Sequence, residues 1–285
     1  MFIAALLTGG FMLAEVIGGL VSGSLALLAD AGHMLTDFAA LLLAWFAFRF
    51  SRWPADRSRT YGFDRLQVLV AYSSGLSLFV IAGFILYEAI HRLSAPVEVL
   101  GGTMLAIAVG GLAINLIVFA ILHGADRDNL NVRAASIHVL GDLLGSVGAI
   151  IAAAIILTTG WNAADPLISI FVVALILWSA WKVVRDSGHI LLEGTPTGLA
   201  LTEIESDLEA NVSGVENVHH VHAWSITEER PMVTLHARLK ESADPDRTIG
   251  AIKQRLSERF NIGHATVEIE LADCADHNDH RRAHG

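Results

Sequence analysis

Residues 27–40 read LLADAGHMLTDFAA and place three ionisable side chains inside a run that is apolar enough for a membrane helix. His33 and Asp37 lie four residues apart, so on a helix they share one face, with Asp30 one turn earlier on the same side. An ionisable group costs about 2.5–3.5 kcal/mol or more at the middle of a bilayer, so it normally faces a partner, a cavity or an ion. The segment therefore predicts a polar site within a membrane.

A second apolar run repeats this spacing. Residues 137–148 read IHVLGDLLGSVG, which places His138 and Asp142 one turn apart on one helix face. Two imidazoles and two carboxylates supply the four nitrogen and oxygen ligands that tetrahedral Zn²⁺ prefers. We therefore predict a transition-metal site within the membrane, formed by His33, Asp37, His138 and Asp142. The alternative is that these groups only form hydrogen bonds between helices.

The composition indicates a membrane protein with an appended soluble part. Of the 285 residues, 53% are hydrophobic and 17% are charged, which is too apolar for an ordinary soluble domain. Apolar runs end near residue 192 and a mixed, charged sequence follows. We therefore predict a membrane domain over residues 1–192, a second domain over 193–273 and a flexible histidine-containing tail over 274–285. The net charge of −10 argues against nucleic acid as a partner.

Six apolar runs are long enough to cross a bilayer, which takes about 20 residues. They cover residues 2–21, 25–48, 66–90, 101–122, 134–157 and 167–184. The segment from the second run to the start of the third carries five arginines, whereas residues 158–166 carry no lysine or arginine. Because positive residues favour the cytoplasmic side, we expect a multi-pass protein with both termini in the cytoplasm. The first run lacks a basic leading segment, so we interpret it as a retained helix rather than a signal peptide.

The sequence after residue 199 alternates between helical and strand patterns. We expect helices over residues 199–212 and 246–260, and strands over 215–226, 232–239 and 265–271. The order αββαβ predicts a small open sheet with its helices on one face. The predicted fold class is therefore a polytopic α-helical membrane protein of six spans with a C-terminal α+β domain.

Several phrases of the sequence together resemble the cation diffusion facilitators, and more narrowly their bacterial zinc-type members. The phrases are the two HxxxD pairs, SGSLALLADAGHMLTD, the loop YGFDR, HVLGDLLGS, and the later VHAW and HATVEIE. The resemblance covers essentially the whole chain. It implies a homodimeric antiporter of the inner (plasma) membrane that exports Zn²⁺, with Cd²⁺ and Co²⁺ as further cargoes, in exchange for protons by alternating access. Histidine in both motifs favours these metals over Mn²⁺.

The resemblance also implies a role for the C-terminal domain, which would be cytoplasmic and metallochaperone-like and would regulate the transporter and join the dimer. A cytoplasmic zinc cluster would use His222, His236, His264 and Glu270, with Glu268, His220, His219 and Cys274 as further candidates. Zn²⁺ would then be both cargo and regulatory ion, and no organic cofactor is expected. Arg65 and Glu193 resemble a charge interlock between the membrane and soluble parts. An ordinary interfacial charge on each is the alternative.

Protons and metal would compete for the same four membrane side chains, because Zn²⁺ needs neutral imidazole and ionised carboxylate. Asp30 could assist proton movement as an accessory group. For three other polar residues in apolar runs, Glu15, Glu88 and Asn115, we expect hydrogen bonds between helices rather than a transport role.

Two alternatives have different functions. A membrane metalloenzyme is disfavoured because HExxH is absent and a four-ligand site leaves no open position for water, so we expect no enzymatic activity. A membrane metal sensor would bind zinc without moving it. Both the sensor and an exporter would lie in membrane lipid, and only a measurement of zinc flux distinguishes them.

Overall fold

The computed structural model describes residues 2–35, 38, 57–123, 130–271 and 274 of the chain. These residues fall into two compact units. One comprises Met1–Arg52 and Val70–Arg185, and the other comprises Trp53–Leu69 and Asp186–Gly285.

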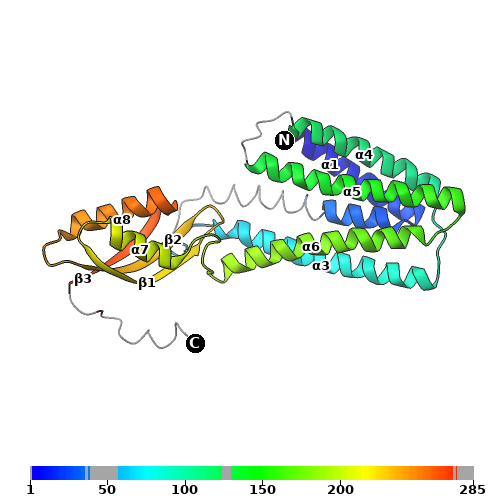
Figure 1. Cartoon of the computed structure of the whole chain (residues 1–285). Helices are drawn as coiled ribbons and strands as arrows, with labels where there is room; N and C mark the ends of the chain where they lie inside the picture. Colours follow the sequence, from blue (N-terminus) through cyan, green and yellow to red (C-terminus); the bar gives the residue numbers. More distant parts are fainter. Residues whose placement is uncertain (1, 36–37, 39–56, 124–129, 272–273, 275–285) are drawn as a thin grey trace. The chain divides into compact units, whose positions relative to one another are not determined.

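The first unit is helical (Figure 1). It contains α1 (Phe2–Ser22), a helical segment over Leu25–Leu35, α4 (Gly101–His123), α5 (Leu130–Thr159) and most of α3 (Arg65–Ser94) and α6 (Ala164–Leu191). Helices α1, α4 and α5 lie side by side, and α3 runs beside α6.

The segment Leu25–Leu35 packs against both groups of helices. Ala26 and Leu27 lie in a buried cluster with apolar residues of α4 and α5. Ala29 lies in a second buried cluster with residues of α3 and α6. The segment that carries His33 is therefore surrounded by helices on more than one side.

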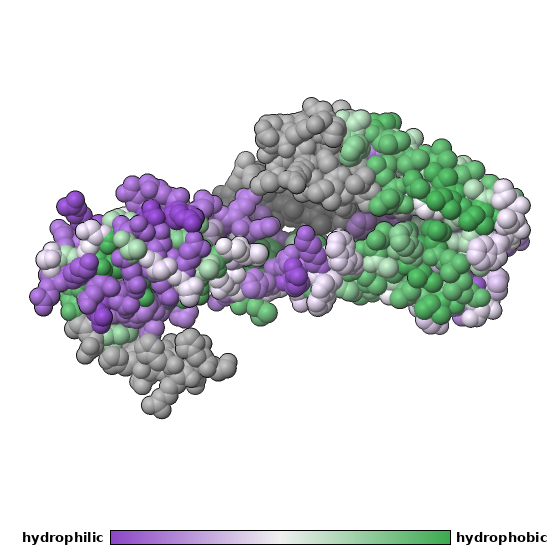
Figure 2. Space-filling model, viewed as in Figure 1, coloured by the Kyte–Doolittle hydropathy of each residue, from purple (hydrophilic) through white to green (hydrophobic). Residues whose placement is uncertain are grey.

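Three helices in the described part of the chain are long and apolar enough to cross a membrane. They are Arg65–Ser94, Asp142–Thr159 and Ala164–Leu191. Gly9–Ser22, Leu25–Leu35 and Gly101–Ile117 are shorter apolar helices. Large apolar side chains such as Val80 and Trp178 are about three-quarters exposed, at 74% and 75%. Figure 2 shows apolar residues over the surface of these helices, as expected for a lipid-facing surface.

The second unit contains a three-stranded sheet. In chain order its elements are α7 (Leu201–Asn211), β1 (Val215–Ser225), β2 (Pro231–Leu239), α8 (Pro245–Phe260) and β3 (His264–Glu270). This is the expected order αββαβ, and the strands lie in the order β1-β2-β3. Strand β2 pairs antiparallel with β1 and parallel with β3. Polar residues cover most of the visible surface of this sheet unit (Figure 2).

One core holds the sheet and both helices together. Ile204 and Leu208 of α7 and Ile252 and Leu256 of α8 are fully buried, at 0% exposure, in one cluster with alternate residues of the strands. Capping interactions explain where α8 begins and where it ends. Asp244 caps the first turn by accepting a hydrogen bond from the backbone of Arg247, and Asn261 ends the helix in the left-handed conformation at φ 56°. The opposite face of the sheet carries polar side chains such as Thr234 and His236 of β2.

Candidate metal centres

Two residues of the predicted membrane site lie close together. His33, on the segment Leu25–Leu35, places Nε2 3.9 Å from Oδ1 of Asp142 on α5. The His33 side chain is 15% exposed and the Asp142 side chain 6% exposed. The two HxxxD motifs, which are more than 100 residues apart in sequence, therefore meet in space.

The side chains of the other two predicted ligands, Asp37 and His138, lie outside what the structure describes. Asp37 lies outside the described residues. The backbone of His138 is part of α5, one turn before Asp142. Helical geometry puts these two positions on the same face of α5.

Asp30 lies beside this pair. Its side chain is buried at 5% exposure, and its Oδ1 would be 3.1 Å from a Cβ added to Gly145 of α5. Gly145 follows Asp142 by three residues on the same helix. Glycine at this position lets the helix backbone approach the acidic side chain. The carboxyl group of Glu15 is also buried, at 1% exposure, and lies near Asp30.

Hydrogen bonds partly match the expectations for the other polar residues. Nδ2 of Asn115 donates to Oγ of Ser146 at 3.4 Å and links α4 to α5, as expected. For Glu88, the expected hydrogen bond between helices is wrong. Its carboxylate accepts from Arg92 of the same helix at 2.9 Å, because the two residues are four apart and share a face.

A buried aspartate that sequence reasoning did not single out fixes the start of the helix that carries His33. Asp165, in the first turn of α6, is fully buried at 0% exposure. It accepts a hydrogen bond of 2.5 Å from the hydroxyl of Ser24. It also accepts bonds of 2.8 and 3.2 Å from the backbone N–H groups of Leu25 and Ala26. A lone acidic residue at the start of an apolar run was the available sequence signal.

The second candidate centre lies on the polar face of the sheet. Leu235 and Ala237 of β2 are buried in the core, so His236 between them points to the opposite face. In register, His236 lies between His219 of β1 and Glu268 of β3. Three neighbouring strands thus bring polar side chains to one area.

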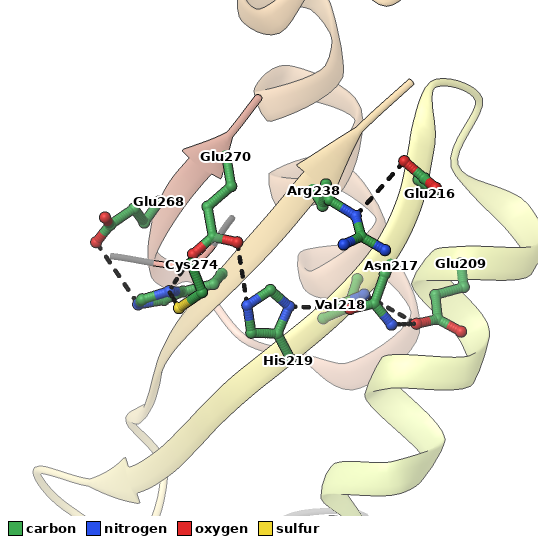
Figure 3. Close-up of polar contacts among 10 residues, drawn as sticks. Glu209, Glu216, Asn217, Val218, His219, Arg238, Glu268, Glu270 and Cys274 are labelled. Carbon is green, nitrogen blue, oxygen red and sulfur yellow. Dashed lines mark hydrogen bonds and ion pairs between the residues drawn. The ribbon is translucent and has the colours of Figure 1, made fainter. Parts of the chain in front are cut away.

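Four potential ligand atoms converge there. Atoms of His219, His236, Glu270 and Cys274 all lie within 4.8 Å of one another. The Glu270 carboxylate contacts both imidazoles, at 2.9 Å from Nδ1 of His236 and 3.1 Å from Nε2 of His219. Sγ of Cys274 lies 3.7 Å from Nδ1 of His236. Figure 3 shows His219, Glu270 and Cys274 pointing toward one another.

The remaining tail residues of the prediction lie around this group. Oε2 of Glu268 is 3.5 Å from Nε2 of His236, and the ring centre of His220 is 5.0 Å from that of His236. His222 is exposed and pairs with Thr234, two residues along β2 from His236. His264 is exposed at the other end of β3, four residues from Glu268. The described structure therefore does not bring His222 or His264 into the four-residue group.

A distortion of β1 explains which histidines meet. The pairing register shifts between His219 and His222, and His220 has a positive φ of 49°. The buried residues Val218 and Val221 are consequently three positions apart rather than two. This bulge lets both His219 and His220 lie near His236, although regular alternation would point them to opposite faces.

The electrostatics of the group suit a cation. Burial lowers the pKa of His219 below the usual value of an imidazole, although Glu270 acts in the opposite direction. Burial raises the pKa of the Glu270 carboxyl, but hydrogen bonds from Cys274 and His236 and the nearby His219 outweigh it and hold that pKa below its usual value. A neutral imidazole and an ionised carboxylate are the forms that bind metal.

Hydrogen bonding also orients His219. Nδ2 of Asn217 donates to Oε1 of Glu209 at 2.9 Å, so the amide oxygen of Asn217 faces Nδ1 of His219 at 3.0 Å. Nδ1 therefore donates, and in the neutral imidazole Nε2 carries the lone pair. That lone pair faces Oε2 of Glu270 at 3.1 Å. Two electron-rich atoms at this distance require a proton or a metal ion between them.

The two residues of the predicted interlock lie together. Nη2 of Arg65 donates to Oε1 of Glu193 at 3.0 Å, and the two side chains are 37% and 62% exposed. Glu193 has a positive φ of 59° just after the last turn of α6. Arg230 after β1 also pairs with Asp64 beside Arg65. Two ion pairs thus connect the start of α3 with later parts of the same unit.

Comparisons with known proteins cover most of the chain. A family model described as the cation efflux transmembrane domain matches residues 1–192, and one described as the cation efflux protein, cytoplasmic domain, matches residues 196–272. The zinc transporter ZitB of Escherichia coli is 51% identical over 268 residues, which cover 94% of this chain and 85% of that protein. The cadmium, cobalt and zinc/H(+)-K(+) antiporter of Bacillus subtilis is 40% identical over 275 residues, covering 95% and 88%.

A solved structure was also found, the metal-bound C-terminal domain of the CzcD transporter from Cupriavidus metallidurans. It is 30% identical, covers 26% of this chain and 100% of that one, and has a TM-score of 0.24. The family models and the full-length relatives agree with each other over both parts of the sequence. This chain belongs to the cation efflux family of membrane proteins, also called the cation diffusion facilitators.

Proposed function

We propose that this chain is a secondary active transporter that exports Zn²⁺ from the cytoplasm in exchange for protons. Membership of the cation efflux family supports a transport role. Relatives named zinc transporter and cadmium, cobalt and zinc/H(+)-K(+) antiporter support both the cargo and the coupling to protons. Cd²⁺ and Co²⁺ are further cargoes under this proposal.

The observation that carries the proposal is the approach of His33 to Asp142. Zn²⁺ holds nitrogen and oxygen ligands about 2.0–2.2 Å away, so two ligands of a tetrahedral site lie about 3.3–3.6 Å apart. The observed 3.9 Å between Nε2 and Oδ1 is a small adjustment away from that separation. We assign Asp37 and His138 as the other two ligands, because each lies four residues in sequence from a member of the pair.

Proton coupling follows from the chemistry of these side chains. Metal binds when the imidazoles are neutral and the carboxylates ionised, and protons bind to the same atoms. When the site faces the cytoplasm, Zn²⁺ displaces protons, and when it faces outward, external protons displace Zn²⁺. Asp30, buried beside Gly145, is the accessory proton-carrying group in this scheme.

We propose that the four-residue group on the sheet holds regulatory zinc. The donor set of two imidazoles, a carboxylate and a thiol suits Zn²⁺, and the facing lone pairs of His219 and Glu270 favour a cation between them. Metal there can shift the transporter only through different affinities for its conformations. Glu268 and His220 lie beside His236 and are secondary ligands in this proposal, whereas His222 and His264 are not part of it.

The proposed architecture follows the sequence prediction. We assign six spans and the transport function to residues 1–192, and regulation and homodimer formation to residues 193–273. The protein would lie in the inner membrane with both termini in the cytoplasm. The Arg65–Glu193 pair would act as the interlock between its parts. The match to the cytoplasmic domain of cation efflux proteins supports the placement of the C-terminal domain.

The test is uptake of Zn²⁺ into proteoliposomes, measured beside Zn²⁺ binding to the same purified protein. The wild type should bind and move zinc, and Asp142→Ala should abolish flux because it removes one of four cargo ligands. Asp246→Ala, which removes an exposed carboxylate of α8, is the matched control and should transport normally. A wild type that binds zinc but moves none would instead be a metal sensor.

A further inference from the structure

A hollow of about 350 Å³ lies within the second unit, away from the four-residue metal group. The loop of residues 58–62 forms one wall, and Arg65 and Glu193 form another. Trp224 of β1 and Ile226 just after it complete the lining. Part of the family phrase YGFDR and the Arg65–Glu193 pair line this space, but the proposed transport chemistry does not use it.

The lining favours an anion. Two guanidinium groups, those of Arg59 and Arg65, line the hollow against one carboxylate, that of Glu193. The carboxylate is already paired with Arg65 at 3.0 Å, so the lining carries a net positive charge. The hydroxyl groups of the same loop and the indole of Trp224 add hydrogen-bond donors. Guanidinium groups with hydroxyl donors are suited to a phosphate group.

The position of Arg59 is supported by an aromatic neighbour. Its guanidinium carbon lies 4.6 Å from the centre of the Phe63 ring in a cation–π contact. Stacking of this kind limits the number of conformations that the long side chain can adopt. An ordered guanidinium loses less entropy when it binds a ligand.

Apolar side chains next to the hollow indicate that the ligand has an acyl part. Arg65 is the first residue of a helix long and apolar enough to cross a membrane, so in the topology given under the proposed function this end of α3 is near a membrane surface. Leu69, one turn further along α3, is 49% exposed, and Leu192, beside Glu193, is 86% exposed. Tyr61 is 44% exposed, and such amphipathic rings are enriched at membrane interfaces.

We propose that this hollow binds the phosphate of an anionic phospholipid, with Arg59 as its principal contact and the exposed leucines against the acyl chains. A soluble phosphate would use the charged lining but would leave the apolar side chains in water. A zwitterionic lipid would meet a positive lining with a headgroup of no net charge. Both therefore should bind more weakly than a lipid such as phosphatidylglycerol.

The test is native mass spectrometry of the full-length protein in detergent with equal amounts of phosphatidylglycerol and phosphatidylcholine of identical acyl chains. Wild type should retain phosphatidylglycerol preferentially. Arg59→Gln should lower this preference about fivefold, the effect of one arginine at an anionic membrane surface. Arg57→Gln is the matched control, because Arg57 is an exposed arginine of the same loop that does not line the hollow. Arg59→Lys, which keeps the charge, should retain most of the preference.

Three outcomes would overturn the proposal. The first is equal retention of the two lipids by the wild type, and the second is an equal effect of the Arg57 and Arg59 substitutions. The third is displacement of phosphatidylglycerol by excess inorganic phosphate that itself binds in an Arg59-dependent way, which would indicate a site for a free anion. Equal melting temperatures of the variants would show that any loss of lipid does not reflect unfolding.

Discussion

His219 acquires its orientation from neighbours outside the four-residue metal group. The amide oxygen of Asn217 accepts a hydrogen bond from Nδ1 of His219 at 3.0 Å, and Glu209 holds Asn217 by accepting from its amide at 2.9 Å. The lone pair of Nε2 is thereby directed at Glu270 and the proposed ion. Partners of this kind fix the tautomer and the ring angle of a ligating histidine.

We expect Asn217→Ala to weaken zinc binding at the sheet by about tenfold or more, the usual cost of losing such a partner. The histidine would remain but would no longer be fixed in one tautomer. Competition with a fluorescent chelator, in a background of Asp142→Ala to silence the membrane site, measures this affinity. Asn211→Ala, which removes an amide bonded only within α7 in the described structure, should leave zinc binding unchanged. Equal affinities for the two variants would contradict the role given to Asn217.

Zinc binding at the four-residue group on the sheet should weaken as pH falls. The lowered pKa values of His219 and Glu270 mean that both groups are deprotonated at neutral pH, so protons compete little there. Because the pKa of His219 lies below the usual imidazole value of about 6.5, protons should displace zinc only at pH values below that, with about a tenfold loss of affinity per pH unit for each proton bound. The chelator titration repeated from neutral pH down to pH values at which imidazoles and carboxylates are protonated checks this. Affinity that stays constant over that whole interval would exclude histidine ligands.

Sequence reasoning predicted the residues of the two sites unequally. The HxxxD spacing predicted that each motif shares one helix face, and the cost of ionisable groups in a membrane predicted that the two faces meet, as His33 and Asp142 do. His236 and Glu270 were expected in the tail group, but His219 and Cys274 were only further candidates. The bulge at His220 changes which side chains of β1 share a face, and no residue type in β1 predicts it.

The helix that carries His33 depends on an element far from it in sequence. Asp165 of α6 accepts bonds from Ser24 and from the first two backbone N–H groups of the helical segment Leu25–Leu35. These donors would have no intrahelical partner at a helix start. Because Asp165 is fully buried, water cannot replace it readily.

We expect Asp165→Ala to destabilise the membrane unit by about 1–3 kcal/mol or more, the cost of leaving a buried donor unsatisfied. The melting temperature of the purified protein should fall. Zinc flux should fall with it, because the start of the helix that carries His33 would no longer be held in place. Asp244→Ala removes the exposed cap of α8 and serves as the matched control, with an expected cost of about 0.5–2 kcal/mol and normal flux. Unchanged stability and flux of Asp165→Ala would refute this role.

Element types were easier to predict than element ends. The αββαβ order followed from periodicity and was confirmed. Helix α5 was expected over residues 134–157 but extends over Leu130–Thr159, because polar residues next to an apolar run can continue a helix. The contribution of Asp165 was also not predictable, since it depends on which distant helix packs against the turn.

In the whole molecule, the proposed transport site in the membrane unit and the proposed zinc group on the sheet belong to one chain. The family assignment and the approach of His33 to Asp142 both support transport. If protons and Zn²⁺ compete for the same atoms, a proton gradient alone must be able to move zinc. This coupling separates an antiporter from a passive pathway and from a sensor.

The most direct measurement starts with equal zinc concentrations on both sides of proteoliposomes and then imposes a pH gradient. The account predicts that zinc accumulates in the acidic compartment as protons leave it, that collapsing the gradient with a protonophore reverses the accumulation, and that Asp142→Ala shows neither effect. Zinc that stays evenly distributed in wild-type vesicles, despite binding to the protein, would contradict proton-coupled export.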